Sequence, residues 1–138
     1  MMEGPMVEDL DRQNCLALLG QLRWGHLALT LDAMPAIRSV RFLLDEGDIR
    51  FWVAKGSRLQ RAVSGAVVAF HAEKINEPAG EATSVQVRGI AKPVGGYGGG
   101  PALARRGLPP WSGAPKADEL LQISTDDITG QRVRWLAG

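Results

Sequence analysis

Six arginine and lysine side chains gather in one stretch of the 138-residue sequence and could bind a phosphate group. Arginine forks and the free backbone N–H groups of a helix N-terminus both bind phosphate oxygens. Ser57 is a favourable residue to begin a short helix, which would put Arg58 at such a terminus. A solvated sheet surface with scattered ion pairs would explain the same residues. They fall within 24 positions and are six of the eight basic residues in the first half of the chain: Arg38, Arg41, Arg50, Lys55, Arg58 and Arg61.

The remaining reactive side chains are not spaced for metal binding or hydrolysis. His26 and His71 are 45 positions apart, with no cysteine or carboxylate beside them at zinc-ligand spacing. We therefore expect no metal site. No G-x-S-x-G segment is present, and Cys15 falls on the apolar face of an expected helix, so the catalytic residues stay unknown. Two acidic pairs occur in turn-like contexts, where carboxylates more often bind backbone N–H groups: Asp45/Glu46 and Asp126/Asp127.

Composition and charge indicate one soluble globular domain over residues 1–138. Hydrophobic residues make up 45% of the chain, and 16 basic residues against 15 acidic ones leave a formal net charge of +1. This balance argues against a nucleic-acid partner. The single Cys15 suits a reducing compartment, and the sequence has neither a signal peptide nor an apolar run long enough to span a membrane. We expect a cytoplasmic protein without membrane contact.

The elements that would position the basic cluster follow from apolar periodicity. A helix is expected over about 9–19, because Cys15, Leu18 and Leu19 recur at helical spacing. Alternating strands are expected from Trp24 to Leu31 and over Ala36–Leu44, then over Ile49–Ala54 after a turn at 45–48. If the last two strands pair across that turn, Arg38 and the 55–58 segment come to the same end of the sheet. The short helix that begins at Ser57 should close at Gly65.

The second half of the chain predicts more strands and one irregular segment. Strands are expected over Ala66–Phe70, Thr83–Val94 and Glu119–Ser124, with Val133–Trp135 as a further candidate. Residues 93–115 hold 7 glycines and 5 prolines and should form no regular structure, with a mobile surface loop at Gly95–Gly100. The glycines do not match G-x-G-x-x-G, so no dinucleotide fold is expected. Residues 1–8 are expected to be flexible. The fold is therefore mainly β, a small antiparallel barrel with one N-terminal helix and a short helix after the third strand.

A series of short motifs occurs in a fixed order from the first expected helix to the C-terminal part. They are Arg23-Trp24-Gly25-His26-Leu27-Ala28, Pro35-Ala36-Ile37-Arg38-Ser39-Val40-Arg41-Phe42, Gly47-Asp48-Ile49-Arg50-Phe51-Trp52, Lys55-Gly56-Ser57-Arg58-Leu59, Val67–Glu73, Ser84-Val85-Gln86-Val87-Arg88-Gly89, Pro110-Trp111 and Ile123–Gly130. In order and spacing this series resembles the pyridoxamine 5′-phosphate oxidase-like split β-barrel flavoproteins. The resemblance covers about residues 9–135.

The resemblance implies a homodimer that binds FMN, or the deazaflavin cofactor of actinobacterial relatives, at the subunit interface. Carried over position by position, the family's phosphate ligands would be Arg38, Ser57 and Arg58, with Lys55 adding charge nearby. Residues along the flavin ring and ribityl chain would be Val40, Trp52 and Val53. Ser84 falls where the family has a polar contact that reaches across from the second subunit.

Some positions depart from the family pattern. Leu59 stands where FMN-binding members often have a lysine, which removes one cation from the expected phosphate site. Thr83 replaces a frequent tryptophan, and the glycine-rich segment after Val94 stands where many relatives have a helix. Arg132 and Arg134 lie near the C-terminus without an accompanying histidine. We therefore expect no vitamin B6 synthesis.

Three functions compete at this point. The first is an oxidoreductase in which a bound flavin or deazaflavin exchanges a hydride with a small organic substrate, so that the cofactor supplies the chemistry. The second is a non-catalytic FMN- or deazaflavin-binding carrier. The third is a cofactor-free barrel that binds single-stranded nucleic acid by stacking on Trp52, Tyr97 and Trp111. The net charge of +1 speaks against the third.

Overall fold

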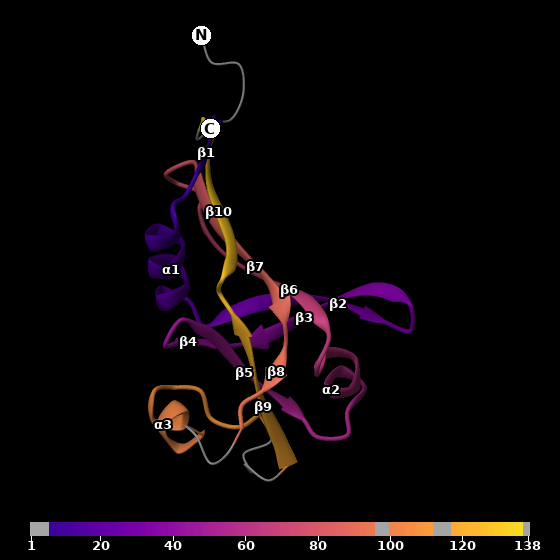
Figure 1. Ribbon diagram of the computed structural model, residues 1–138. Helices are drawn as coiled ribbons and strands as arrows, with labels where there is room; N and C mark the ends of the chain where they lie inside the picture. The colour runs from indigo at the N-terminus through magenta and orange to yellow at the C-terminus, as the bar shows by residue number, and fades with distance from the viewer. Residues whose placement is uncertain (1–5, 96–99, 112–116, 137–138) are drawn as a thin grey trace.

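Two antiparallel sheets form the protein in the computed structural model, which describes residues 6–95, 100–111 and 117–136 (Figure 1). The larger sheet has six strands in the order β1 (Met6–Asp9), β10 (Asp127–Arg134), β7 (Glu81–Ile90), β6 (Val67–Asn76), β2 (Trp24–Leu31) and β3 (Met34–Arg41). The smaller sheet has four in the order β4 (Leu43–Asp45), β5 (Asp48–Ala54), β9 (Asp118–Ser124) and β8 (Lys92–Pro93). The prediction of a mainly β split barrel is confirmed.

Helix α1 (Arg12–Gln21) covers one face of the larger sheet beside β7 and β10 (Figure 1). The side chain of Asp11 caps it by accepting a hydrogen bond from the backbone N–H of Asn14, at 2.8 Å. The predicted apolar stripe is confirmed, since Cys15, Leu18 and Leu19 are all buried. They join the main core, which is filled by the inward residues of both sheets.

The expectation of one strand over Ala36–Leu44 is wrong. Strand β3 ends at Arg41 in the larger sheet, and β4 begins at Leu43 in the smaller sheet. The reason lies in two consecutive buried side chains, Phe42 and Leu43, which break the alternation of a single strand. Phe42 donates its backbone N–H to the carbonyl of Arg23 at 2.8 Å, so the chain changes sheets there.

Two tight turns connect these strands. The predicted turn after Asp45 is confirmed, with Glu46 and Gly47 at φ values of 51° and 82° between β4 and β5. Asp32 and Ala33 have φ values of 52° and 62° between β2 and β3. Positive φ at both central residues is typical of type I′ hairpins, which match the twist of the paired strands.

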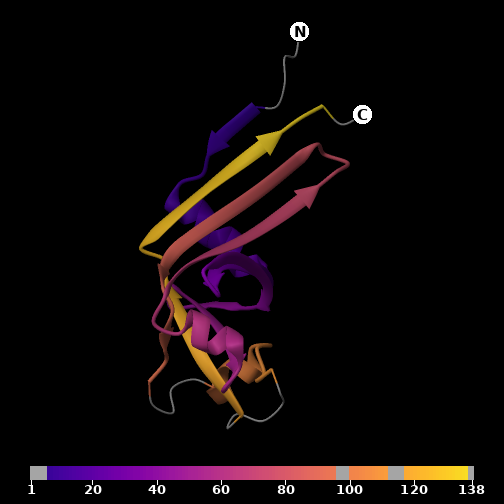
Figure 2. The same ribbon diagram turned by 90° about the vertical axis from the view of Figure 1, so that its right-hand side faces the viewer.

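The short helix after β5 also has the predicted form. Helix α2 (Arg58–Val63) begins after Ser57, whose hydroxyl accepts a hydrogen bond from the backbone N–H of Gln60 at 3.1 Å. Gly65 has a φ of 79° just after it. The strand predicted over Ala66–Phe70 is present but continues as β6 to Asn76, and together with β7 and β10 it forms an extended arm of the larger sheet (Figure 2).

The expectation that residues 93–115 contain no regular structure is wrong, because helix α3 spans Gly100–Arg105. Its end forms a Schellman motif, in which Leu108 N–H bonds the Leu103 carbonyl at 2.8 Å and Gly107 N–H bonds the Ala104 carbonyl at 3.2 Å. Leu103 and Leu108 are both buried in a small second cluster with Leu43 and Leu120. Burial of these leucines supports the helix despite the glycines and prolines around it.

Residues 6–8 of the segment expected to be flexible belong to a strand. Strand β1 pairs Met6 to Arg134 and Asp9 to Gln131 at the edge of the larger sheet. Glu8 reinforces the pairing through an ion pair with Arg132, at 2.9 Å, and this contact lowers the pKa of the Glu8 carboxyl. Residues 1–5 and the loop predicted around residues 96–99 lie outside the described residues.

The last predicted strands are present with shifted bounds. The strand expected over Thr83–Val94 is divided into β7 and the two-residue β8, and the final candidate at Val133–Trp135 is the end of the longer β10. No helix among the described residues is long and apolar enough to span a membrane.

Candidate functional site

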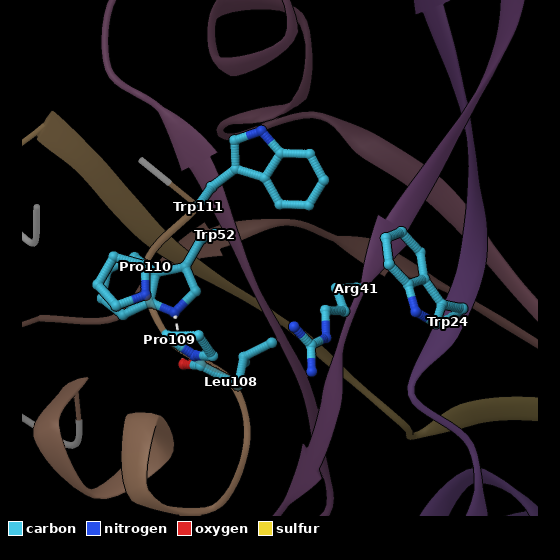
Figure 3. Close-up of a pocket in the computed structure, with 7 residues that line it drawn as sticks. All are labelled: Trp24, Arg41, Trp52, Leu108, Pro109, Pro110 and Trp111. Atoms are coloured by element: carbon cyan, nitrogen blue, oxygen red, sulfur yellow. Dashed lines mark hydrogen bonds between the residues drawn. The ribbon is translucent and has the colours of Figure 1, made fainter. Parts of the chain in front are cut away.

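A groove runs along the line where β3 of the larger sheet meets β5 of the smaller sheet. Its wider part is a pocket of about 250 Å³, and a narrower extension of about 80 Å³ continues along the two strands. The two parts share Arg41, Trp52 and Trp111. The wider part is further lined by Trp24, Leu108, Pro109 and Pro110 (Figure 3). The extension is further lined by Ser39, Val40, Val53 and Ala54.

Three of the four tryptophans in the chain surround this groove. Trp24 on β2 and Trp111 after α3 approach edge to face, with ring centroids 6.3 Å apart and an interplanar angle of 74°. Both rings are more than half exposed. Trp52 on β5 is anchored from below, because its indole N–H donates to the Leu108 carbonyl at 3.1 Å (Figure 3). The groove is thus an aromatic surface held partly by β-strands and partly by the segment that follows α3.

Arg41 lies at the centre of the wider part, and its guanidinium lies between Leu108 and Trp24 (Figure 3). Its backbone pairs with that of Trp24 across β2 and β3. The Nε atom is shielded from water and has no hydrogen-bond partner among the described residues. Arg50 on the neighbouring strand β5 also has a buried Nε atom without a partner, but its Nη1 atom is 3.0 Å from the Asp45 carboxylate. The groove therefore holds a cation that no described carboxylate neutralises.

The residues predicted to lie along a flavin ring and ribityl chain are brought together. Val40, Trp52 and Val53 all line the narrow extension, although they come from strands of different sheets. The side chains of Val40 and Val53 are buried in the main core, so mainly their backbone is available at the groove. Their contact with a flavin stays a prediction.

The residues predicted to bind phosphate lie near one end of the extension. Arg38 precedes Ser39 in the chain, and Lys55 follows Ala54, so both are next to residues that line the groove. The expected pairing of the two strands across the turn holds only for Leu43 and Leu44, which pair with Arg50 and Ile49. The rest of the expected strand belongs to β3 and pairs with β2. Arg38 is exposed, and its guanidinium donates only to the Ile37 carbonyl, at 3.0 Å.

Ser57 and Arg58 already have local partners. The Ser57 hydroxyl donates to the Ala54 carbonyl at 2.7 Å while it caps α2. Arg58 forms an exposed ion pair with Asp32 in the β2–β3 turn. An exposed ion pair of this kind contributes little to stability, so a competing anion could replace the carboxylate at small cost.

Ser84 is on a different part of the molecule. It lies on β7 and lines a shallow hollow of about 300 Å³ on the larger sheet, together with Asp9, His71, Gln86, Thr129, Gly130 and Gln131. The predicted role of Ser84 as a contact from a second subunit requires it to serve the groove of another copy. This placement apart from the groove of its own chain is compatible with that prediction.

No site role is expected from sequence for Trp24, Leu108 or Pro109, which the structure places in the groove. Trp24 is exposed next to the buried Gly25, and an exposed tryptophan at the start of a strand is the signal that could have identified it. For Leu108 and Pro109 the sequence carries no such signal, since they lie in the segment expected to be irregular. Among the described residues, no cluster of histidine, cysteine and carboxylate side chains could hold a metal ion.

Comparisons with known proteins agree with this architecture. The family model described as pyridoxamine 5′-phosphate oxidase matches residues 11–132. An uncharacterized protein of Mycobacterium tuberculosis is 30% identical over 134 residues, which cover 92% of this chain and 86% of that protein.

Solved structures show the same fold. A structure described as the FAD binding protein from Mycobacterium smegmatis has a TM-score of 0.77 and 26% identity, and the match covers 92% of this chain and 98% of that chain. An FAD-binding protein from Mesorhizobium loti has a TM-score of 0.74 and 18% identity, with 96% of this chain and 100% of that chain covered. From the split-barrel architecture and the family match over residues 11–132, we conclude that the chain belongs to the pyridoxamine 5′-phosphate oxidase family.

Proposed function

We propose that this protein binds a flavin in the groove between its two sheets and uses it to exchange a hydride with a small organic substrate. The observation that carries the proposal is the convergence of Val40, Trp52 and Val53 on one groove, from strands of two sheets. The family to which the chain belongs includes flavin oxidoreductases, and a similar structure from Mycobacterium smegmatis is described as FAD binding. FMN is the flavin we expect first, with FAD and the deazaflavin cofactor as alternatives.

The residues present fit such a cofactor. The groove offers flat aromatic surfaces for a ring system, and Arg38, Lys55, Ser57 and Arg58 lie near one end of it for a phosphate. A flavin supplies the hydride acceptor and donor when it is bound, so the protein needs no catalytic acid–base pair of its own. The groove residues agree with this, since Arg41 is the one titratable side chain among the described residues that line the groove. Their tasks would be to bind the ring, to orient it and to exclude water.

A second copy of the chain would complete the site. The narrow extension of about 80 Å³ and the exposed rings of Trp24 and Trp111 leave much of a flavin uncovered by one chain. Further apolar side chains are exposed on β3, at Met34 and Ile37. We therefore propose a homodimer in which Ser84 of one copy reaches the cofactor of the other. Sedimentation at micromolar concentration would contradict this arrangement if it showed only monomer.

Absorbance titrations of the purified protein with FMN, FAD and the deazaflavin cofactor, performed separately at low salt, test cofactor binding. We expect the visible spectrum of at least one cofactor to shift on binding. Arg58→Ala should weaken that binding by roughly tenfold to a hundredfold, because it removes a charge-assisted contact to phosphate. Arg88→Ala is a matched control, since Arg88 is also an exposed arginine paired with an aspartate, Asp127, at 3.2 Å.

A rate measurement separates the proposed enzyme from the alternative, a non-catalytic flavin or deazaflavin carrier. Reduced cofactor bound to the protein should pass its hydride to an organic acceptor faster than the free cofactor does. Tight binding without any such acceleration across a panel of acceptors would favour the carrier. If none of the three cofactors binds to the folded protein, the proposed function is wrong.

A further inference from the structure

Arg41 differs from the other arginines that enter or border the core of this molecule. Arg50 pairs with Asp45, and Arg12 donates to the carbonyl and the hydroxyl of Thr125 at 2.6 and 3.1 Å. Within the described part of the chain, Arg41 has neither an ion-pair nor a hydrogen-bond acceptor, and its Nε atom is out of contact with water. A guanidinium that lines a groove without an acceptor for its terminal nitrogens is unfavourable, so an anionic acceptor from another molecule would be favoured there.

The space around Arg41 selects a flat and small occupant. Trp24, Trp52 and Trp111 line the wider part of the groove together with Leu108 and two prolines, and none of the described residues that line it is a carboxylate. Its volume is about 250 Å³. An apolar cavity of about 150 Å³ accommodates benzene, so the space suits a molecule of one or two fused rings. A complete flavin, with three rings and a ribityl chain, is larger than this space and would lie along the narrow extension, where a second copy would cover it.

We infer that the wider part of the groove binds a planar aromatic carboxylate, with its rings against the tryptophans and its carboxylate on the guanidinium of Arg41. The two terminal Nη atoms of a guanidinium form a fork that matches the two oxygens of a carboxylate. Aromatic faces favour flat ring systems in offset or edge-to-face contact. This inference rests on the proposed function and names the substrate class of the same site, beside the part of the groove assigned to the flavin.

Calorimetric titration with two naphthalene probes of similar shape, one charged and one neutral, tests this inference. 2-Naphthoate carries the carboxylate, and 2-naphthylmethanol is a neutral molecule of similar shape. We expect the protein to bind the carboxylate at least tenfold more tightly than the alcohol. Arg41→Gln should remove this preference by weakening the carboxylate roughly tenfold to a hundredfold while leaving the alcohol unchanged. Arg88→Gln, which removes an arginine that does not line the groove, should keep the preference.

Trp111→Leu provides a second variant on an exposed position, where loss of folding is not expected. It should weaken both probes to a similar extent, because it removes an aromatic wall and leaves the cation in place. Equal affinity of the wild-type protein for the two probes would overturn the inference. The same holds if Arg41→Gln retains the preference for the carboxylate.

Flavin binding, followed by visible absorbance in the same variants, keeps the two proposals distinguishable. The carboxylate should bind whether or not the cofactor is present. If the cofactor and 2-naphthoate exclude each other, the wider pocket belongs to the cofactor and the inference is wrong. If no cofactor binds while the carboxylate preference persists, the proposed function fails and the carboxylate site stands.

Discussion

The thiol of Cys15 is enclosed between α1 and β10. Its side chain is almost completely buried, and a Cβ atom added to Gly130 on β10 would lie 2.6 Å from its sulfur. Burial raises the pKa of the Cys15 thiol, and the negative charge of Asp11 adds to the effect. The thiolate is the reactive form of cysteine. Cys15 should therefore be unreactive in the folded protein at neutral pH.

The raised pKa of Cys15 also predicts a pH dependence of stability. The unfolded thiol ionises at lower pH than the folded one, so the contribution to stability is complete below the unfolded pKa and is lost as pH rises through the folded pKa. We expect the free energy of unfolding to fall more steeply from pH 8 to pH 10 in the wild type than in Cys15→Ala. Urea unfolding of both proteins at the two pH values measures the difference. Parallel pH profiles would contradict the prediction, because other ionisable groups titrate alike in the two proteins.

Single residues were predictable where a local rule applies. Ser57 could be identified as a helix cap, and Cys15 as a buried residue, because capping and helical spacing depend on neighbours in the sequence. The partner of Arg58, by contrast, is Asp32, which lies 26 positions earlier. The close approach of Gly130 to Cys15 and to the Ser84 carbonyl is equally a product of tertiary packing. No local pattern predicts such contacts.

Helix α3 offers a test at the level of one element. Gly107 ends it with a φ of 99°, a conformation that an L-residue adopts at a cost of about 1–2 kcal/mol. Gly107→Ala should lower the free energy of unfolding by about 1 kcal/mol and loosen Leu108, whose carbonyl holds the indole of Trp52. The measurement is urea unfolding at constant pH.

Gly20→Ala is the matched control for Gly107→Ala. Gly20 is within α1, and nothing lies within 4 Å of an added Cβ atom. Since alanine is favoured over glycine inside a helix by about 1 kcal/mol, this variant should gain stability. A Gly107→Ala protein as stable as the wild type would show that the left-handed residue is not needed to end α3.

Helices and strands are predictable where the apolar pattern runs over many residues. They are not predictable where a short element is held by contacts with distant strands. The eight residues of β2 alternate clearly between buried and exposed positions, and the strand was predicted with its bounds. Helix α3 has six residues, and its support comes from Leu43 and Leu120 on distant strands. Strand β1 is exposed along its whole length and is held by pairing with β10. Neither element has a periodic signal of its own.

Thr125 connects several parts of the whole molecule. It is buried between β9 and β10, and its hydroxyl donates to the Gly47 carbonyl at 2.6 Å while accepting from Arg12 at 3.1 Å. Its carbonyl also accepts from Arg12, at 2.6 Å. One residue thus joins α1 to the β4–β5 turn and to the connection between the two sheets.

Thr125→Val should lower the free energy of unfolding by about 1–3 kcal/mol, because it leaves buried polar partners without their hydrogen bonds while the volume stays similar. Thr129→Val is the control, since Thr129 is exposed on β10 and should change stability by less than about 0.5 kcal/mol. Thermal and urea unfolding should rank the proteins alike. A Thr125→Val protein no less stable than its control would show that the hydroxyl does not hold the two sheets together.

The position of Arg41 in an aromatic groove is a property of the whole molecule and was not evident from the sequence. The sequence placed Arg41 in a basic cluster and Trp111 in a closing segment, but only the folded chain brings both beside Trp24 and Trp52. Arg41 is the last residue of β3, directly before the chain leaves the larger sheet at Phe42.

Because the groove is assembled from distant segments, its ligands stabilise the native state of the protein. The walls of the groove come from β2, β3, β5 and the residues after α3, so a chain that has not finished folding has no such site. A molecule that binds only the native state stabilises it by about 2.7 kcal/mol when present at a hundred times its dissociation constant. In a cell, the supply of cofactor and substrate would then set how long each copy escapes proteolysis, and abundance would follow metabolism without any change in synthesis.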